Sequence, residues 1–231
     1  MTAELHPWQV AGQLLAVTSN DWHSPQGVLR RFERSDPNSS WQQSGVETPV
    51  ALGRNGLAWG RGLHPAIENA PKQRREGDGC SPAGIFRLPS AFGLDPIHAH
   101  PSIRLPYRQI TDDLECVDDP DSIYYNTLIR RRDIVTPDWR SSEKMQAIGE
   151  EYRLGVVVDH NSSPCRAGCG SCIFLHVWIS FDTHTSGCTA MSFDSMRSLL
   201  EWLNPERHPI LVQLPASEWS QRAEDWNLPA L

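Results

Sequence analysis

Residues 172–179 read Cys172-Ile-Phe-Leu-His-Val-Trp-Ile179, an apolar stretch with the length and composition of a buried strand. Successive side chains of a strand point to opposite faces. One face of this strand is aliphatic and carries Ile173, Leu175 and Val177. The other face carries Phe174, His176 and Trp178. We therefore expect the aliphatic face to pack in the core, and His176 to lie on the second face beside aromatic side chains.

Similar short apolar runs recur between turn residues along the rest of the chain. They cover residues 13–18, 27–32, 48–52, 82–88, 155–159 and 210–214. The first two are separated by turn residues and predict a pair of strands joined by a loop. The 16 glycines and 18 prolines are spread along the chain, which is typical of a β-rich domain with many turns. The sequence predicts one mainly β domain over residues 1–231.

Two segments predict short helices. The first runs over about 142–152, with Met145, Ile148 and Tyr152 on one face. The second follows Ser192, whose hydroxyl is suited to accept a hydrogen bond from an unpaired backbone N–H at a helix start. Its apolar residues recur at helical spacing, and they are Phe193, Met196, Leu199, Leu200 and Leu203.

The composition of the chain excludes several classes of protein. The 231 residues carry a net charge of −7, which argues against a nucleic-acid-binding protein. No run of about 18 apolar residues is present, so we expect no membrane span. Residues 1–12 have neither a basic start nor an apolar stretch and do not read as a signal peptide. The protein is therefore either cytoplasmic or written here without its leader.

Cys188 is the candidate nucleophile. It follows Ser186-Gly187, a pair of small residues suited to a tight turn, and Gly187 permits close approach of the backbone to a ligand. The backbone N–H groups of Gly187 and Cys188 could point at a developing oxyanion. A thiol needs a base or a positive neighbour to ionise near neutral pH. The eleven residues between His176 and Cys188 are enough to fold back and bring the two side chains together. The competing interpretation is that His176 is a structural residue and Cys188 a buried free cysteine, with no catalytic role for either.

A second pattern of cysteines overlaps this pair. Cys165, Cys169, Cys172 and His176 follow a C-x3-C-x2-C-x3-H spacing. The first three match an iron–sulfur motif, but the rest of the chain is too short for the barrel in which that motif sits. If residues 172–176 form a strand, its ends are roughly 13 Å apart. They then cannot share a zinc ion, whose ligands lie at about 2.0–2.3 Å. A disulfide within residues 165–172, or free thiols, remains.

Three further residues are candidates for contacts with a substrate. Trp178 lies on the same predicted strand face as His176, and Thr189 directly follows Cys188. His160 comes just after the strand that ends at Asp159. It is either a second polar group in a groove or a structural residue at the end of a strand.

These residues resemble the YkuD-like L,D-transpeptidase family. The family motif is a histidine, a spacer, and then Ser/Thr-x-Gly-Cys or Ser-Gly-Cys, which His176 and Ser186-Gly187-Cys188 match. Other segments look like the same family, and the similarity covers roughly residues 13–214. These segments are Leu52-Gly-Arg-Asn-Gly-Leu-Ala-Trp59, Glu76-Gly-Asp-Gly-Cys-Ser-Pro-Ala-Gly-Ile-Phe86, Tyr124-Tyr-Asn126, Tyr152 to Asn161, and Ile173-Phe-Leu-His176.

The resemblance implies a curved mixed β-sandwich with a few short helices, and peptidoglycan stem peptides as the substrate. It implies that Cys188 forms a thioester, that His176 acts as the general base, and that the backbone near Gly187 holds the oxyanion. No metal or organic cofactor is implied. Two features depart from the family. Thr189-Ala190-Met191 lacks the arginine that many members carry after the cysteine, and the spacer is short.

Several alternatives to a transpeptidase stay open. The same fold also suits an L,D-carboxypeptidase or an amidase-type peptidoglycan hydrolase. A non-catalytic wall-binding domain and a metal-binding module are the others. Because peptidoglycan lies outside the cytoplasmic membrane, we expect a periplasmic or extracytoplasmic protein, with a cytoplasmic role in recycling as the alternative. The oligomeric state cannot be read from the sequence.

The six cysteines divide by this argument into a nucleophile and five others. A nucleophile must stay unpaired, which leaves Cys80, Cys116, Cys165, Cys169 and Cys172. Five is an odd number, so at least one more thiol is free if no intermolecular bridge forms. We expect that thiol to be Cys172, packed on the strand, and a short-range Cys165–Cys169 bridge is compatible with disulfide geometry.

Overall fold

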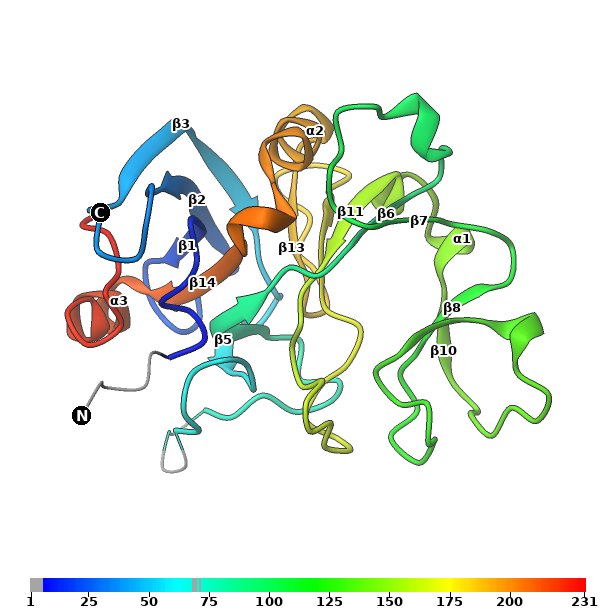
Figure 1. Cartoon of the computed structure of the whole chain (residues 1–231). Coiled ribbons are helices and arrows are strands. Elements are labelled where there is room, and N and C mark those ends of the chain that lie inside the picture. The colour runs from blue at the N-terminus through cyan, green and yellow to red at the C-terminus, as the bar shows by residue number, and fades with distance from the viewer. Residues whose placement is uncertain (1–5, 68–69, 71) are drawn as a thin grey trace.

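The computed structural model describes residues 6–67, 70 and 72–231. These residues form a mainly β protein built on one large mixed sheet and one small sheet (Figure 1). The large sheet has eleven strands. In spatial order they are β4 (Leu57–Trp59), β5 (Ser81–Arg87), β14 (Ile210–Pro215), β1 (Gln13–Ser19), β2 (Gln26–Glu33), β3 (Gln42–Ala51), β13 (Thr189–Met191), β12 (Phe174–Val177), β11 (Leu154–Val157), β6 (Ala91–Gly93) and β7 (Tyr107–Gln109).

The small sheet has three strands and lies beside the β6–β7 end of the large one (Figure 1). Its strands are, in spatial order, β10 (Ser142–Lys144), β8 (Leu114–Val117) and β9 (Leu128–Arg130). The α-helices are α1 (Met145–Ile148), α2 (Phe193–Trp202) and α3 (Ala216–Arg222). Short 3-10 helices are η1 (Ile97–Ala99), η2 (Arg131–Asp133), η3 (Gly149–Tyr152) and η4 (Pro205–Arg207). No helix in the described part of the chain is long and apolar enough to cross a membrane.

The predicted pair of N-terminal strands is confirmed as β1 and β2. They pair in antiparallel register, with Ala16 opposite Arg30. The Asp21 carboxylate shapes the connection, because it accepts hydrogen bonds from the backbone N–H groups of His23 (2.7 Å) and Ser24 (2.8 Å). Such side-chain-to-backbone bonds stabilise turns. On its other edge β1 pairs in parallel with β14, which comes from residues 210–215.

The two faces of the strand quoted at the outset face two different hydrophobic clusters. Ile173, Leu175 and Val177 belong to the main core, which also includes side chains of helices α2 and α3. Phe174 belongs to a second cluster, with Phe92, Tyr152 and Cys188 among its members. The alternation of faces is therefore confirmed for residues 173–177, but strand β12 is shorter than the predicted stretch 172–179, and Cys172 and Trp178 lie outside it. The second cluster lies where the large sheet meets the small one.

The predicted helix over 142–152 is only partly present. Its first three residues form strand β10, and only four residues form helix α1 before Gly149 interrupts it with φ +75°. Tertiary contacts override the helical pattern here, because Ser142 and Lys144 both donate to the buried Glu115 carboxylate of β8. The helix after Ser192 is confirmed as α2, and the Ser192 hydroxyl accepts a hydrogen bond from the Ser195 N–H.

The expectation that Cys172 is free is wrong. Cys172 forms a disulfide with Cys116 of β8, and their Cα atoms are 5.9 Å apart. Cys80, Cys165, Cys169 and Cys188 are free, so the Cys165–Cys169 bridge is also wrong. A long-range partner 56 residues away decides the pairing, and local spacing carries no sign of it. The bond ties the small sheet to the start of β12.

Candidate active site

Strands β12 and β13 place Cys188 and His176 on one face of the sheet. The strands are parallel, with Leu175 opposite Thr189 and His176 opposite Ala190. Cys188 directly precedes β13 and lies next to Phe174, whose backbone N–H donates to Cys188 Sγ over 3.3 Å. His176 is two residues further along β12 than Phe174, so the two side chains are diagonal neighbours.

Hydrogen bonds fix the backbone around Cys188. Its carbonyl oxygen accepts from Ser81 Oγ (2.7 Å) and from Thr185 Oγ1 (2.6 Å). Its thiol donates to the carbonyl of Cys172 over 3.6 Å, which places it beside the disulfide. Cys188 is only 8% exposed. The thiol is therefore held in one orientation in a nearly closed position.

Gly187 has room for no side chain. Its φ of +156° is rarely adopted by other residues, and a Cβ atom there would lie 2.7 Å from Arg74 Nη2 and 3.1 Å from the Cys80 carbonyl. Its N–H, expected to face an oxyanion, donates to Thr185 Oγ1 over 3.2 Å. The neighbouring Ser186 is exposed and accepts a hydrogen bond from Arg54 Nη1. Gly187 thus serves close packing, with its N–H already engaged.

His176 is buried between the strand and the ring of Tyr152. It is 5% exposed, and the two ring centroids are 5.3 Å apart. Nδ1 lies 2.7 Å from the Val177 carbonyl, which assigns it the proton and leaves Nε2 to accept. Burial lowers the pKa of His176, and backbone hydrogen bonds with Val177 and Glu151 oppose this shift. Within the described residues, no hydrogen bond joins the ring to Cys188 Sγ.

The Cys188 thiol is protonated in this structure at neutral pH. Burial raises its pKa most strongly, and the Glu143 carboxylate adds to that rise. The hydrogen bond from the Phe174 N–H and the charge of Arg74 lower its pKa to a smaller extent. A reactive thiolate consequently requires a change at the site, such as the binding of a ligand that alters the surrounding charge.

Glu143 and Tyr152 also lie at the site, although no sequence pattern marks them as functional. Tyr152 Oη donates to Glu143 Oε2 over 2.7 Å. Burial raises the pKa of Glu143 to about 7, and the nearby carboxylates of Asp118 and Glu76 contribute to this rise. A single helix over 142–152 does not predict a contact between these two residues. In the structure, Glu143 lies in β10 and Tyr152 in η3, and these two elements bring the side chains together in the second cluster. A carboxyl group that titrates near neutral pH is a candidate for proton transfer.

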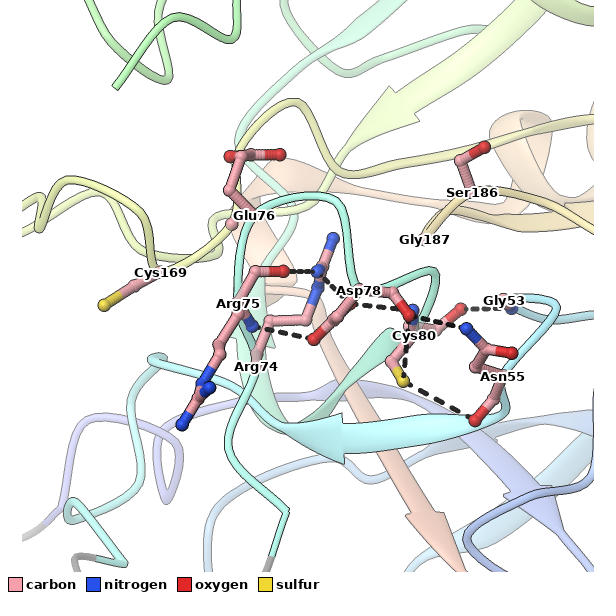
Figure 2. Close-up of polar contacts among 12 residues, drawn as sticks. Gly53, Asn55, Arg74, Arg75, Glu76, Asp78, Cys80, Cys169, Ser186 and Gly187 are labelled. Atoms are coloured by element: carbon pink, nitrogen blue, oxygen red, sulfur yellow. Dashed lines mark hydrogen bonds and ion pairs between the residues drawn. The ribbon is translucent and has the colours of Figure 1, made fainter. Parts of the chain in front are cut away.

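The loop between β4 and β5 runs beside Gly187 and carries several charged residues (Figure 2). Arg74 forms an ion pair with Asp78, and the Asp78 carboxylate also accepts from the N–H groups of Arg75 (2.7 Å) and Cys80 (2.9 Å). Glu76 accepts hydrogen bonds from the hydroxyls of Tyr125 and Ser171. These contacts hold the loop in one shape against the Ser186–Cys188 turn.

The three predicted substrate contacts lie in different surroundings. His160 is buried, and its ring is hydrogen-bonded to the Arg61 N–H (3.3 Å) and the Cys169 carbonyl (3.1 Å). Burial and the charge of Arg74 lower its pKa to about 3, so it is neutral. Thr189 is buried and donates to Gln213 Oε1. Trp178 is half-buried and packs edge-on against Phe181. Only Trp178 retains an accessible surface.

The overlapping cysteine pattern is divided by the disulfide. Cys172 is bonded to Cys116, whereas Cys165 is exposed and Cys169 half-buried. In the part of the chain that the structure describes, no three His, Cys, Asp or Glu side chains are grouped so that they could hold a metal ion.

Comparisons with protein-family models, with curated proteins and with solved structures each found no match.

Proposed function

We propose that the protein is a cysteine acyltransferase that acts on peptidoglycan stem peptides, as an L,D-transpeptidase of the YkuD-like kind does. Cys188 is the nucleophile and His176 the general base. One observation carries the proposal: Cys188, directly before β13, and His176 of the neighbouring strand β12 lie close together, beside two titratable groups, Glu143 and Tyr152.

The proposed reaction has two steps. The Cys188 thiol proton passes to His176 Nε2, and Sγ attacks the carbonyl carbon of the residue that precedes a D-amino acid. The peptide C–N bond breaks, the leaving amine takes a proton from His176, and a thioester remains on Cys188. An acceptor amine then attacks the thioester carbon, its proton passes to His176, and the C–S bond breaks. The new amide is a crosslink, and the thiol is regenerated.

The protonation states suit these steps. His176 is neutral because burial lowers its pKa, and a neutral imidazole can accept a proton. The thiol must leave the Cys172 carbonyl and turn toward Nε2 before it reacts. Catalytic hydrogen bonds are often incomplete without substrate.

Hydrolysis is the second candidate reaction. Water in place of the amine would make the protein an L,D-carboxypeptidase or an amidase-type hydrolase. The absence of an arginine in Thr189-Ala190-Met191 favours it, since this is where the chain departs from the family's pattern. The Cys116–Cys172 disulfide supports an extracytoplasmic location for either reaction, because such bonds persist in oxidising compartments.

The test incubates the protein with muropeptides that carry tetrapeptide stems. We expect Cys188→Ala to reduce turnover by about 10⁴–10⁶-fold, as when a nucleophile is removed. Cys80→Ala is the matched control, because Cys80 is another buried free cysteine, and this variant should keep its activity. Mass spectrometry of the products separates the two reactions, since crosslinked dimers indicate transfer and shortened stems alone indicate hydrolysis. Full turnover by the Cys188→Ala variant would refute both the transfer and the hydrolysis reaction at Cys188.

A further inference from the structure

Arg74 is a buried cation beside the turn that carries the nucleophile. Its side chain is 3% exposed. One amino group of its guanidinium, Nη1, donates to the Asp78 carboxylate and to the Arg75 carbonyl. Asp78 is in turn held by two backbone N–H groups of the same loop. The orientation of the guanidinium is therefore fixed by its own loop.

The other edge of this guanidinium has no acceptor among the residues that the structure describes. Nε is buried and without a hydrogen-bond partner, and no acceptor for Nη2 is found among the described residues. Leaving buried donors unpaired is costly, so an unused edge on a fixed arginine indicates a missing partner. In Figure 2 the free amino group points away from Asp78, toward the side of Ser186 and Gly187.

The free edge lies next to the nucleophile. A Cβ atom on Gly187 would come within 2.7 Å of Arg74 Nη2, and Gly187 directly precedes Cys188. A side chain at position 187 would therefore collide with Nη2. Arg74 also counters the Glu143 and Glu151 carboxylates that act on the thiol. A ligand that reaches Cys188 therefore meets a cation on the Gly187 side.

We propose that Arg74 is a substrate-binding residue, whose Nε–Nη2 edge binds a carboxylate of the molecule that Cys188 attacks. A planar guanidinium edge matches the two oxygens of a carboxylate, and the two hydrogen bonds give orientation as well as affinity. The identity of this carboxylate rests on the proposed function. For a stem-peptide substrate, Arg74 would bind the free carboxylate of the D-amino acid next to the scissile bond.

A purely structural Arg74 would act differently. It would only hold Asp78 and the loop, and its loss would affect charged and neutral ligands equally. The test therefore compares two alkylating reagents of similar size, iodoacetate and iodoacetamide, which differ in the carboxylate. Their rates at Cys188 are followed by mass spectrometry of the peptide that contains it, because Cys80, Cys165 and Cys169 are also free.

We expect Arg74→Gln to lower the iodoacetate-to-iodoacetamide rate ratio at Cys188 by about tenfold, the size of a lost charge-assisted hydrogen bond. Arg75→Gln is the matched control, because Arg75 is the exposed neighbour, and its ratio should be unchanged. Arg74→Lys keeps the positive charge but lacks the planar two-donor edge of the guanidinium, and it should give an intermediate ratio. It also serves if Arg74→Gln does not fold. An equal fall in both rates, or an unchanged ratio, would overturn the assignment.

Turnover separates this inference from the proposed function. With a stem peptide and its C-terminal carboxamide as substrates, Arg74→Gln should raise KM about tenfold for the free acid alone. If the peptide is processed but neither ratio nor KM depends on Arg74, the inference fails and the function stands. If the alkylation ratio depends on Arg74 but no muropeptide is processed, only the function fails. A Cys188 that reacts with neither reagent overturns both.

Discussion

Two regions of opposite charge act on the Cys188 thiol, and they come from different parts of the molecule. The small sheet brings Glu143, whose carboxylate raises the pKa of the thiol. The loop between β4 and β5 brings Arg74, which lowers it. Burial and the carboxylate outweigh the guanidinium, so the thiol stays protonated. The small sheet and the loop thus shift the pKa of the same thiol in opposite directions, and burial adds to the effect of the small sheet.

The substitution with the largest expected effect is at His176, and it tests whether this residue or a charged group of the two regions acts as the general base. We expect His176→Gln to lower kcat on muropeptides by about 10²–10⁴-fold, because a positioned general base contributes that much. His184→Gln is the control, since His184 is exposed on the loop just before Cys188 and should be neutral. If Glu143→Gln instead abolished turnover while His176→Gln left it intact, the small sheet would supply the base.

The next largest effect is expected from removing the disulfide that ties the small sheet, which carries Glu143, to the start of β12. Replacing both disulfide cysteines, as Cys116→Ala/Cys172→Ala, should lower the free energy of unfolding by about 2–5 kcal/mol in urea titrations. The bond closes a separation of 56 residues and ties β8 to the start of β12. Hydrogen exchange should show the largest loss of protection in residues 114–144. Cys165→Ala/Cys169→Ala removes two free thiols, and equal destabilisation by this pair would contradict the prediction.

A smaller effect should appear in the pH dependence of stability. Burial raises the pKa of Glu143 from 4.5 to about 7, so the folded state binds its proton more tightly than the unfolded chain. Its contribution is full below pH 4.5 and is lost as pH rises to about 7. Glu143→Gln should therefore gain about 1–3 kcal/mol relative to the wild type between these values. Parallel stability curves of the two proteins would disprove the shift.

The smallest effect concerns the contact between Tyr152 and Glu143. The Tyr152 hydroxyl lowers the pKa of Glu143, so Tyr152→Phe should raise it further and move the pH-dependent loss of stability upward. The change in unfolding free energy should be about 0.5–1.5 kcal/mol, the net value of one hydrogen bond. The ring remains against His176 in this variant. A downward shift of the midpoint would refute the role of the hydroxyl.

The strands that carry the site could be predicted because their signals are local. Alternation along 173–177 separates the two faces, and the turn and N-cap residues around 188–192 position β13 and α2. Glu143 and Tyr152 could not be found in this way. The helical spacing of Met145, Ile148 and Tyr152 is real, but contacts of Ser142 and Lys144 with Glu115 place the start of this segment in a sheet.

The position of Arg74 beside the Ser186–Cys188 turn could not be predicted from local sequence patterns either. Directly after Cys188, where many members of the resembled family carry an arginine, this chain has Thr189-Ala190-Met191. The structure supplies Arg74 from a loop more than a hundred residues earlier in the chain. The Cys116–Cys172 bond is of the same kind, since its partner is distant. Neither juxtaposition leaves a periodic or spacing signal, because both result from how separate elements pack.

The position of β14 has a consequence for the synthesis of the protein. This strand, residues 210–215, lies between β1 and β5 and pairs with both. While the chain is being made, β1 has β2 on one side and an open edge on the other until those residues emerge. An open strand edge invites pairing with other chains. The nascent chain thus cannot complete its sheet until residues 210–215 have left the ribosome, and the edge of β1 is open to self-association during that interval.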